Sequence, residues 1–540
     1  MVQKIFKVTS KYLHIPVRSD DPESFYYIEV IADGKVKNEF LIGIAAPDEQ
    51  FDFYAPLDMK RYETDAITLV CRQENVKSNL FDALIVGDEL ENRPELYPDL
   101  YKEEIRQQVH FSPTRGWLND PNGLFYKDGV FHMYFQHNPF ANHHFSTNVS
   151  WGHAVSADGV HFREYGDAIM PRSSRYHIAS GSAIVDENNI SGKGHGTVLA
   201  AYTDLSTHQY HGRPAITSGC GQMLMYSTNN GMTFHYFDEQ AIISVPDFEQ
   251  WRDPKILQLN DKTLCIAVYE TFEGKNCISF YKSKDCKKWE FCSRIMDFYE
   301  CPDLFKLKVT NTDEELWVVY GANGKYHIGR FEDFTFTPIE IEGYIDYGDA
   351  VYAGQTFNNY ESDTKRIYTA WLRDYEHTWT YKADEPNRKY GFSQAMALFT
   401  ELSIHKTKKG YRLFRAPIAA LETLRDIGKD IMLNEATKAN APYEAVFTLR
   451  KDCDARIQVG AAWFTYDSKN HRIDSSSGKS YELCSDDDLS VRIIVDTRSA
   501  EIFLQSEITM SFSVKQAEIK ADCGYLVDGK LYTLKSIWKK

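Results

Sequence analysis

One recurring turn constrains the fold of this 540-residue chain more than any other feature. Three segments place a serine at the end of a strand-like run, then an Asp or Asn turn, then an aromatic residue; they are 156–162, 227–234 and 283–289. The spacing fits a four-stranded sheet repeated with insertions. Such hairpins occur in many all-β proteins, but three copies favour propeller blades around a central channel.

The length requires more than one domain, because hydrophobic cores stop growing at roughly 250–300 residues. We expect an all-β chain with a small β-rich module over residues 1–100 and a propeller over 106–414. An amphipathic linker over 415–434 then leads to a β-sandwich over 435–540. In both end regions, short runs rich in β-branched and aromatic residues alternate with turns, which is typical of strands.

The composition limits the classes of partner. The chain is 43% apolar and 26% charged, as in ordinary globular proteins. Its formal net charge of −16 would repel nucleic acid and an anionic membrane surface. No run approaches the ~18 apolar residues of a membrane span. We therefore expect neither nucleic acid nor a membrane as a partner, while a homo-oligomer is left open.

The amino terminus and the cysteines bear on the compartment. Residues 1–10 contain no continuous apolar stretch and no small-residue cleavage site. The ten cysteines are scattered without paired spacing, which favours reduced thiols over a disulfide framework. These features predict a cytoplasmic protein, although a secreted protein given without its leader would look the same.

Three carboxylates occupy similar positions, each one or two residues before a proline and just ahead of a strand-like run. Asp120, Asp253 and Glu300 each lie in a different expected blade. An Asp-Pro turn alone is ordinary. Three in the same relative position predict convergence at one end of the propeller axis, where catalytic groups gather on loops.

Paired carboxylates are suited to cleaving a glycosidic bond. One attacks or stabilises the anomeric carbon, and the other, kept protonated, gives its proton to the leaving oxygen. A third acid beside an arginine suits hydrogen bonding to sugar hydroxyls. We expect Arg252 to keep Asp253 ionised, so that Asp253 does not compete for the acid's role.

The ordered motifs resemble glycoside hydrolase family 32, the invertase, inulinase and levanase family. The resemblance extends from about Val109 to the carboxyl end and implies a five-bladed propeller, a carboxyl-terminal β-sandwich and retaining hydrolysis of β-fructofuranosides. The motifs are Trp117-Leu-Asn-Asp-Pro-Asn-Gly123, Gln136-His-Asn-Pro, Trp151-Gly-His-Ala, Ser180-Gly-Ser, Arg252-Asp-Pro, Glu300-Cys-Pro and Trp371.

The resemblance implies a role for each matched residue. Asp120 would be the nucleophile, Glu300 the general acid and then base, and Asp253 the transition-state stabiliser. The substrate-binding residues would be Trp117, Asn119, Gln136, Ser180, Arg252 and Trp371. No cofactor is implied. Six histidines crowd residues 132–161 but lack the spacing of a zinc site, so no metal is expected either.

Two positions depart from the family's pattern. Where a tryptophan usually stands before the Trp-Gly-His-Ala motif, this chain has Ser146, and Phe145, His143 or His144 are candidate replacements. Where a phenylalanine usually precedes Ser-Gly-Ser, it has Ala179. Both aromatic residues normally form walls of the fructose pocket, so the departures bear on substrate choice.

We therefore expect an exo-acting β-fructosidase for sucrose or short fructo-oligosaccharides, with inulin or levan as further substrates. A fructosyltransferase or an endo-acting fructanase would use the same catalytic residues. A fructan-binding protein without activity is a further alternative, which the three intact acids disfavour.

Overall fold

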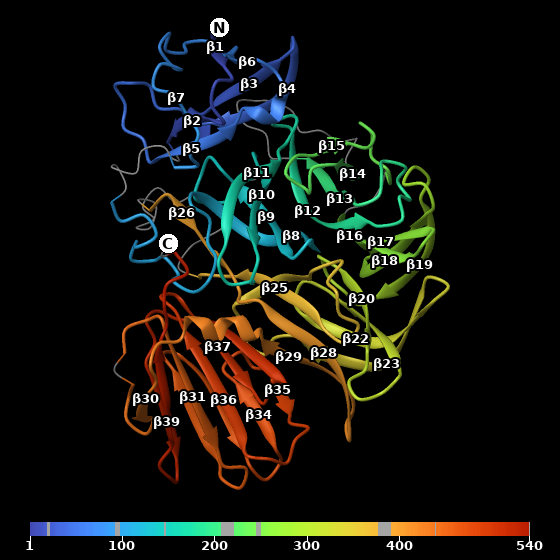
Figure 1. The fold of residues 1–540 in the computed structure, drawn as a ribbon, viewed down its shortest axis with the longest axis vertical. Helices are drawn as coiled ribbons and strands as arrows, with labels where there is room; N and C mark the ends of the chain where they lie inside the picture. Colours follow the sequence, from blue (N-terminus) through green and yellow to red (C-terminus); the bar gives the residue numbers. More distant parts are fainter. Residues whose placement is uncertain are drawn as a thin grey trace.

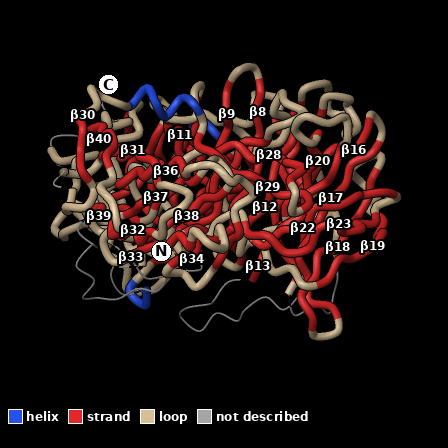
Figure 2. The backbone as a smooth tube through the Cα atoms, turned by 90° about the horizontal axis from the view of Figure 1, so that it is seen from below, coloured by secondary structure: helices blue, strands red, loops and turns tan. Residues whose placement is uncertain are grey.

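The computed structural model describes residues 1–18, 22–91, 98–144, 147–206, 221–244, 250–375, 390–437 and 439–538. Strands dominate this part of the chain (Figure 2). Helix is limited there to short 3-10 turns, which include η1 (Pro22–Ser24), η2 (Lys60–Tyr62) and η5 (Ala419–Leu424). No helix in these ranges is long and apolar enough to cross a membrane.

The amino-terminal region forms two antiparallel sheets that share one apolar core. One sheet has the order β1-β6-β3-β4 and the other β5-β2-β7. Their strands are β1 (Val2–Lys7), β2 (Tyr12–Val17), β3 (Tyr26–Ala32), β4 (Lys35–Ile42), β5 (Phe53–Asp58), β6 (Ala66–Cys71) and β7 (Ile85–Gly87). Strand β4 is an edge strand, so one side of its backbone is open to other parts of the molecule.

Five antiparallel sheets follow, each built from strands that are consecutive or nearly so. The first contains β8 (Gly116–Lys127), β9 (Val130–Asn138), β10 (Ser150–Ser156) and β11 (Arg163–Ile169); the second contains β12 (Tyr176–Asp186), β13 (Thr197–Ser206), β14 (Gly221–Ser227) and β15 (His235–Tyr236). The third contains β16 (Trp251–Asn260), β17 (Thr263–Phe272), β18 (Lys275–Ser283) and β19 (Glu290–Met296). The fourth contains β20 (Asp303–Lys308), β21 (Glu315–Tyr320), β22 (Lys325–Glu332) and β23 (Thr335–Tyr344); the fifth contains β24 (Val351–Thr356), β25 (Arg366–Leu372), β28 (Thr400–Thr407) and β29 (Gly410–Pro417).

The first strand of each sheet packs against the first strand of the next sheet, and the first strand of the fifth sheet packs against that of the first. β8 contacts β12, β12 contacts β16, β16 contacts β20, and β24 contacts β8. Two short strands strengthen the closure: β26 (Phe392–Ser393) pairs in parallel with β8, and β27 (Ala395–Met396) pairs with β25. Figure 1 shows these sheets in the middle of the molecule.

The recurring serine turn lies between the third and fourth strands of the first three sheets. The hydroxyl of Ser156 accepts the backbone N–H of Gly159 at 2.8 Å. Ser227 and Ser283 accept backbone N–H groups in the same way, at 2.9 and 3.0 Å. A serine that ends a strand and fixes the next turn explains why the pattern repeats.

The carboxyl-terminal region again has two sheets around one apolar core. β29 runs to Pro417, three residues beyond the expected end of the preceding region, and η5 lies within the expected linker. One sheet contains β30 (Lys429–Met432), β40 (Asp528–Thr533), β31 (Tyr443–Leu449), β36 (Leu489–Val495), β37 (Ser499–Leu504) and β38 (Ile508–Ser513). The other contains β35 (Ser480–Glu482), β34 (Arg472–Ser475), β33 (Ala462–Asp467), β32 (Ala455–Val459) and β39 (Ile519–Cys523).

A buried charge cluster joins this region to the segment that precedes β8. Nδ1 of His110 lies 2.8 Å from Asp496 and its Nε2 lies 3.1 Å from Glu501, so both ring nitrogens face carboxylates. Asp496 also accepts the backbone N–H of Val109, and Glu501 accepts that of Leu398. Burial alone would lower the pKa of His110, but the two carboxylates outweigh it and raise the pKa to about 9.

We expect His110 to make stability fall at alkaline pH. A histidine pKa raised above its ordinary 6.5 contributes stability that is complete below about pH 6.5 and is lost as the pH rises through about 9, on the order of 3 kcal/mol in all. The Tm deficit of His110→Gln should therefore be larger at pH 6 than at pH 9.5. The exposed control His195→Gln should have no such dependence, and a deficit for His110→Gln that ignores pH would contradict the assignment.

Candidate active site

The first strands of four of the five central sheets each contain a β-bulge, and the bulges lie at or next to predicted site residues such as Asp120, Ser180 and Asp253. Register shifts occur between Leu118 and Pro121, Ile178 and Gly181, Arg252 and Lys255, and Tyr352 and Gln355. A bulge interrupts the alternation of side chains and re-aims the residue within it. It also accommodates a proline that a regular central strand would exclude.

The bulges change where the carboxylates lie along the chain. Asp120 and Asp253 were expected where a loop enters a strand, but both lie inside strands, β8 and β16. The neighbouring residues Pro121 and Pro254 suggested that the strand could not include these positions, but a β-bulge accommodates each proline within the strand. Glu300 precedes β20, as expected.

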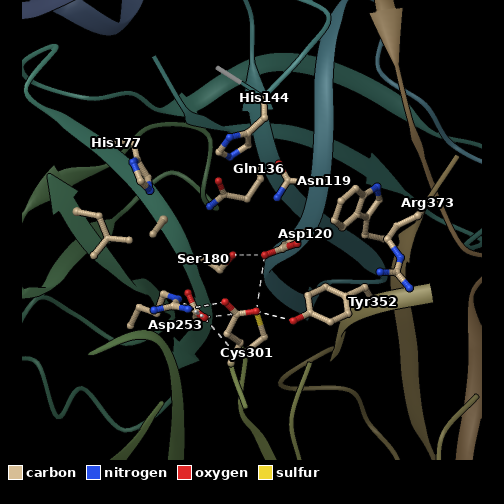
Figure 3. A pocket seen from close by; sticks show the side chains of 15 residues that line it. Asn119, Asp120, Gln136, His144, His177, Ser180, Asp253, Cys301, Tyr352 and Arg373 are labelled. Atoms are coloured by element: carbon tan, nitrogen blue, oxygen red, sulfur yellow. Dashed lines mark hydrogen bonds and ion pairs between the residues drawn. The ribbon is translucent and has the colours of Figure 1, made fainter. Parts of the chain in front are cut away.

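These residues surround a cavity of about 460 Å³ (Figure 3). It is lined by Asn119, Asp120, Gln136, His144, His177, Ala179, Ser180, Leu205, Arg252, Asp253, Glu300, Cys301, Tyr352, Trp371 and Arg373. The structure thus brings together every predicted site residue except Trp117.

Trp117 lies behind the wall of the cavity. Its side chain is buried, and its indole N–H donates to the side-chain oxygen of Asn119 at 2.8 Å. Its ring packs edge-on against Trp371, with centroids 6.1 Å apart. It therefore supports two lining residues and does not line the cavity itself.

Glu300 is held from two sides. Its Oε1 forms an ion pair with the guanidinium of Arg252, and its Oε2 accepts the hydroxyl of Tyr352 at 2.5 Å. Arg252 also places Nε 3.7 Å from Asp253. The backbone of Asp253, Glu300 and Cys301 is left-handed, with φ of 64°, 49° and 39°. Such backbone is costly outside glycine and persists where the surroundings fix it, often at functional sites.

The thiol of Cys301 lies between the two aspartates. Its Sγ is 3.6 Å from both Asp120 Oδ2 and Asp253 Oδ2, and its backbone N–H donates to Asp253 at 3.1 Å. Burial first, and then the neighbouring carboxylates, raise the pKa of this thiol well above its usual value. Cys301 therefore stays protonated and acts as a hydrogen-bond donor.

Sequence reasoning missed Tyr352, Arg373 and His177, because no motif marked them. Of the residues considered as replacements for the usual tryptophan, His144 lines the cavity and His143 is buried beside it. Phe145 and Ser146 lie outside the described residues. Ala179 lines the cavity as a small residue. In the part of the chain that the structure describes, no group of three or more His, Cys, Asp or Glu side chains is arranged to hold a metal ion.

A family model described as the glycosyl hydrolases family 32 N-terminal domain matches residues 110–417. The chain belongs to glycoside hydrolase family 32. The matched residues comprise the five sheets and every residue that lines the cavity. They exclude the amino-terminal sheets and the carboxyl-terminal ones.

Curated family 32 relatives match over part of their length. The chain is 32% identical over 373 residues to an invertase of Wickerhamomyces anomalus, covering 63% of each chain, and 30% identical over 355 residues to a levanase of Bacillus subtilis, covering 61% of this chain and 49% of the levanase. The chain thus spans less than two thirds of either relative. Among solved structures, the exo-inulinase from Aspergillus awamori superposes with a TM-score of 0.68 at 22% identity, covering 81% of this chain and all of that one. That likeness shows a shared fold.

The two aspartates of this family 32 site, Asp120 and Asp253, are costly to ionise. Burial is the main cause that raises the pKa of Asp120 to about 6, with a hydrogen bond from Ser180 at 2.7 Å acting against it. Burial likewise raises the pKa of Asp253 to about 7. Arg252 lowers that pKa, but Glu300 and Asp120 add to the effect of burial. We expected Arg252 to keep Asp253 ionised, and this expectation is wrong. Burial raises the pKa of Asp253 by more than Arg252 lowers it, and Arg252 is shared with Glu300.

We expect Asp253→Asn to stabilise the protein at neutral and alkaline pH. A carboxyl pKa raised from 3.8 to about 7 destabilises the fold by an amount that is absent below about pH 4 and complete above pH 7, up to about 4 kcal/mol. The gain in Tm should grow over that range. As a contrast, Asp303→Asn should lower Tm, because Asp303 pairs with buried Lys255 at 3.0 Å. A Tm loss for Asp253→Asn at pH 8 would contradict the prediction.

Proposed function

We propose that this family 32 protein releases terminal fructose from β-fructofuranosides such as sucrose and fructo-oligosaccharides, with inulin and levan as possible longer substrates. The observation that supports this best is the convergence of Asp120, Asp253 and Glu300 on one cavity. Relatives named invertase, levanase and extracellular exo-inulinase agree with this substrate class. A fructofuranosidase from Schwanniomyces occidentalis, solved with fructose, shares the fold.

In the proposed retaining reaction, the carboxylate of Asp120 attacks the anomeric carbon and forms a fructosyl-enzyme. The glycosidic C–O bond breaks, and protonated Glu300 gives its proton to the leaving oxygen. Water then attacks the same carbon, Glu300 takes the water's proton, and Asp120 leaves as a carboxylate. Ser180 supports the ionised form of Asp120, while Arg252 and Tyr352 orient Glu300. Asp253 hydrogen-bonds sugar hydroxyls as charge develops on the ring.

The size of the cavity supports an exo-acting enzyme. Its volume of about 460 Å³ lies at the small end of typical ligand pockets, which span roughly 300–1,000 Å³. One terminal fructosyl unit with part of its leaving group fits this space better than an internal stretch of polymer. Fructosyl transfer, endo-acting cleavage and binding without catalysis are the alternatives that product analysis separates.

We also propose that the five sheets form a five-bladed propeller over about 106–414 and that the carboxyl-terminal sheets form a β-sandwich. Two sheets around one core over residues 1–100 support a separate amino-terminal module. The nine cysteines that the structure describes are free thiols, which favours a reducing compartment. Several matched relatives are named extracellular, which favours secretion instead. Fractionation of the native host would decide the location.

Product analysis tests the proposed function. Incubation with sucrose, kestose, inulin or levan should release free fructose. Accumulation of longer oligosaccharides would favour a transferase, internal fragments would favour endo-acting cleavage, and binding without products would overturn the proposal in favour of a binding protein.

The two principal carboxylates should respond differently to the leaving group. Asp120→Ala and Glu300→Ala should each lower kcat by about 10²–10⁴ on sucrose while the fold remains intact. With an aryl fructoside, whose leaving group needs little protonation, Glu300→Ala should recover much of its rate, whereas Asp120→Ala should not. The exposed control Asp285→Ala should match the wild type. Near-normal turnover of sucrose by either variant would refute the roles assigned here.

A further inference from the structure

The core of the amino-terminal module includes residues from the loops that lead into the cavity wall. Phe140, just after β9, and Met170, just after β11, are buried in the same apolar cluster as Phe40 of β4. The rings of Phe40 and Phe140 meet edge-on with centroids 5.2 Å apart. Four residues after Phe140 comes His144, and seven after Met170 comes His177, so both anchors lie close to lining residues.

Edge strand β4 also binds the ends of these loops through hydrogen bonds. The side-chain amide of buried Asn148 accepts the backbone N–H of Leu41 at 2.9 Å and donates to its carbonyl at 2.7 Å. It thereby pairs the N–H and C=O of Leu41 at the open edge, as another strand would. Asn38 donates to the carbonyl of Pro171 at 2.7 Å, and Ser174 donates to Glu39 at 2.5 Å.

Two hydrogen bonds connect the residues held by β4 to residues that line the cavity. The carbonyl of Val149, next to Asn148, accepts the backbone N–H of Ile178 at 3.0 Å, and Ile178 follows His177. The carbonyl of Ile178 in turn accepts the amide N–H of Gln136 at 2.9 Å. His144 and His177 lie with their ring centroids 6.5 Å apart, across the cavity from Asp253 and Cys301 (Figure 3).

We propose that the amino-terminal module is a positioning domain for the substrate site: through β4 it fixes the wall formed by His144 and His177, and so sets the affinity for the fructosyl unit. This rests on the proposed function. The module lies outside residues 110–417, so a determinant of substrate affinity lies beyond the part of the chain that the family model matches.

The chemistry of the wall suits sugar hydroxyls. Burial lowers the pKa of His144 to about 3, with His177 and His143 contributing, so its ring is uncharged at neutral pH. A neutral imidazole has one donor and one acceptor nitrogen, as a hydroxyl partner requires. An uncharged imidazole at this wall is suited to exchange hydrogen bonds with a sugar hydroxyl, which an apolar ring is not.

The test compares Asn148→Ala with Tyr12→Phe in the full-length protein. Asn148→Ala removes both bonds to β4, whereas Tyr12→Phe removes a different contact of the module, the 2.9 Å bond from the Tyr12 hydroxyl to the carbonyl of Tyr165. We expect Asn148→Ala to raise KM for sucrose about tenfold with kcat within about threefold, the size expected for losing hydrogen bonds at one site. Tyr12→Phe should leave both constants unchanged. A proportional loss of kcat, or an unchanged KM, would overturn the proposal.

A double-mutant cycle tests whether the effect passes through the wall. His144→Ala should raise KM by a similar factor, and adding it to Asn148→Ala should have little further effect, because the two changes disturb one unit. Fully additive effects would show that Asn148 does not act through His144.

Hydrogen exchange without sugar separates this proposal from the proposed function. Asn148→Ala should accelerate amide exchange in 139–144, 147–149 and 176–178 relative to Tyr12→Phe, whether or not the protein cleaves fructosides. Unchanged exchange there would overturn the positioning role. If Asn148→Ala does not fold, Asn38→Ala, which removes the bond to Pro171, takes its place with the same expected outcomes.

Discussion

The site depends on bulged first strands packed against one another. A regular strand presents alternate side chains to opposite faces, so consecutive residues such as Asn119 and Asp120 would point apart. The register shift between Leu118 and Pro121 breaks that alternation, and similar shifts occur in β12, β16 and β24. Because each bulge lies at the same end of its strand, residues far apart in sequence surround one cavity. Gly181 shows how tight this packing is, since a Cβ there would lie 2.1 Å from the carbonyl oxygen of Ala201.

Concentrating three carboxylates in this buried space has an electrostatic cost that the site only partly offsets. One guanidinium, that of Arg252, serves both Glu300 and Asp253, and single hydroxyls from Ser180 and Tyr352 serve Asp120 and Glu300. Below this layer, Lys255 forms an ion pair with Oδ2 of Asp303 between β16, β20 and β24. The contrast separates two uses of buried charge: Asp303 joins neighbouring first strands, while Asp120 and Asp253 have less compensation and therefore raised pKa values.

Sequence reasoning was most successful where a residue's role is local. The serine turns were predictable because a hydroxyl two to four residues from its partner needs no tertiary context, and the carboxylates could be found because each lies in a short motif. Position within a strand was harder, since Pro121 and Pro254 look like strand breaks unless a bulge is known. Tyr352, Arg373 and His177 were not predictable, because packing between distant sheets brings them to the cavity. The raised pKa of Asp253 likewise depends on burial, which no neighbouring residue in the sequence reveals.

The two sides of the cavity are held in place differently: the carboxylates by the central sheets, and the histidine wall by the amino-terminal module. The three carboxylates, Asp120, Asp253 and Glu300, lie on or beside the first strands of the sheets, where many backbone hydrogen bonds hold them. The histidines of the opposite wall lie on or next to loops, and loops keep a fixed geometry only when something binds them. In this molecule the binding comes from the edge of β4, whose open N–H and C=O groups would otherwise need water or another strand. At Asn148 the same two hydrogen bonds cover part of the edge of β4 and fix a loop. The proposed control of substrate affinity by the amino-terminal module therefore leaves Asp120, Asp253 and Glu300 in place.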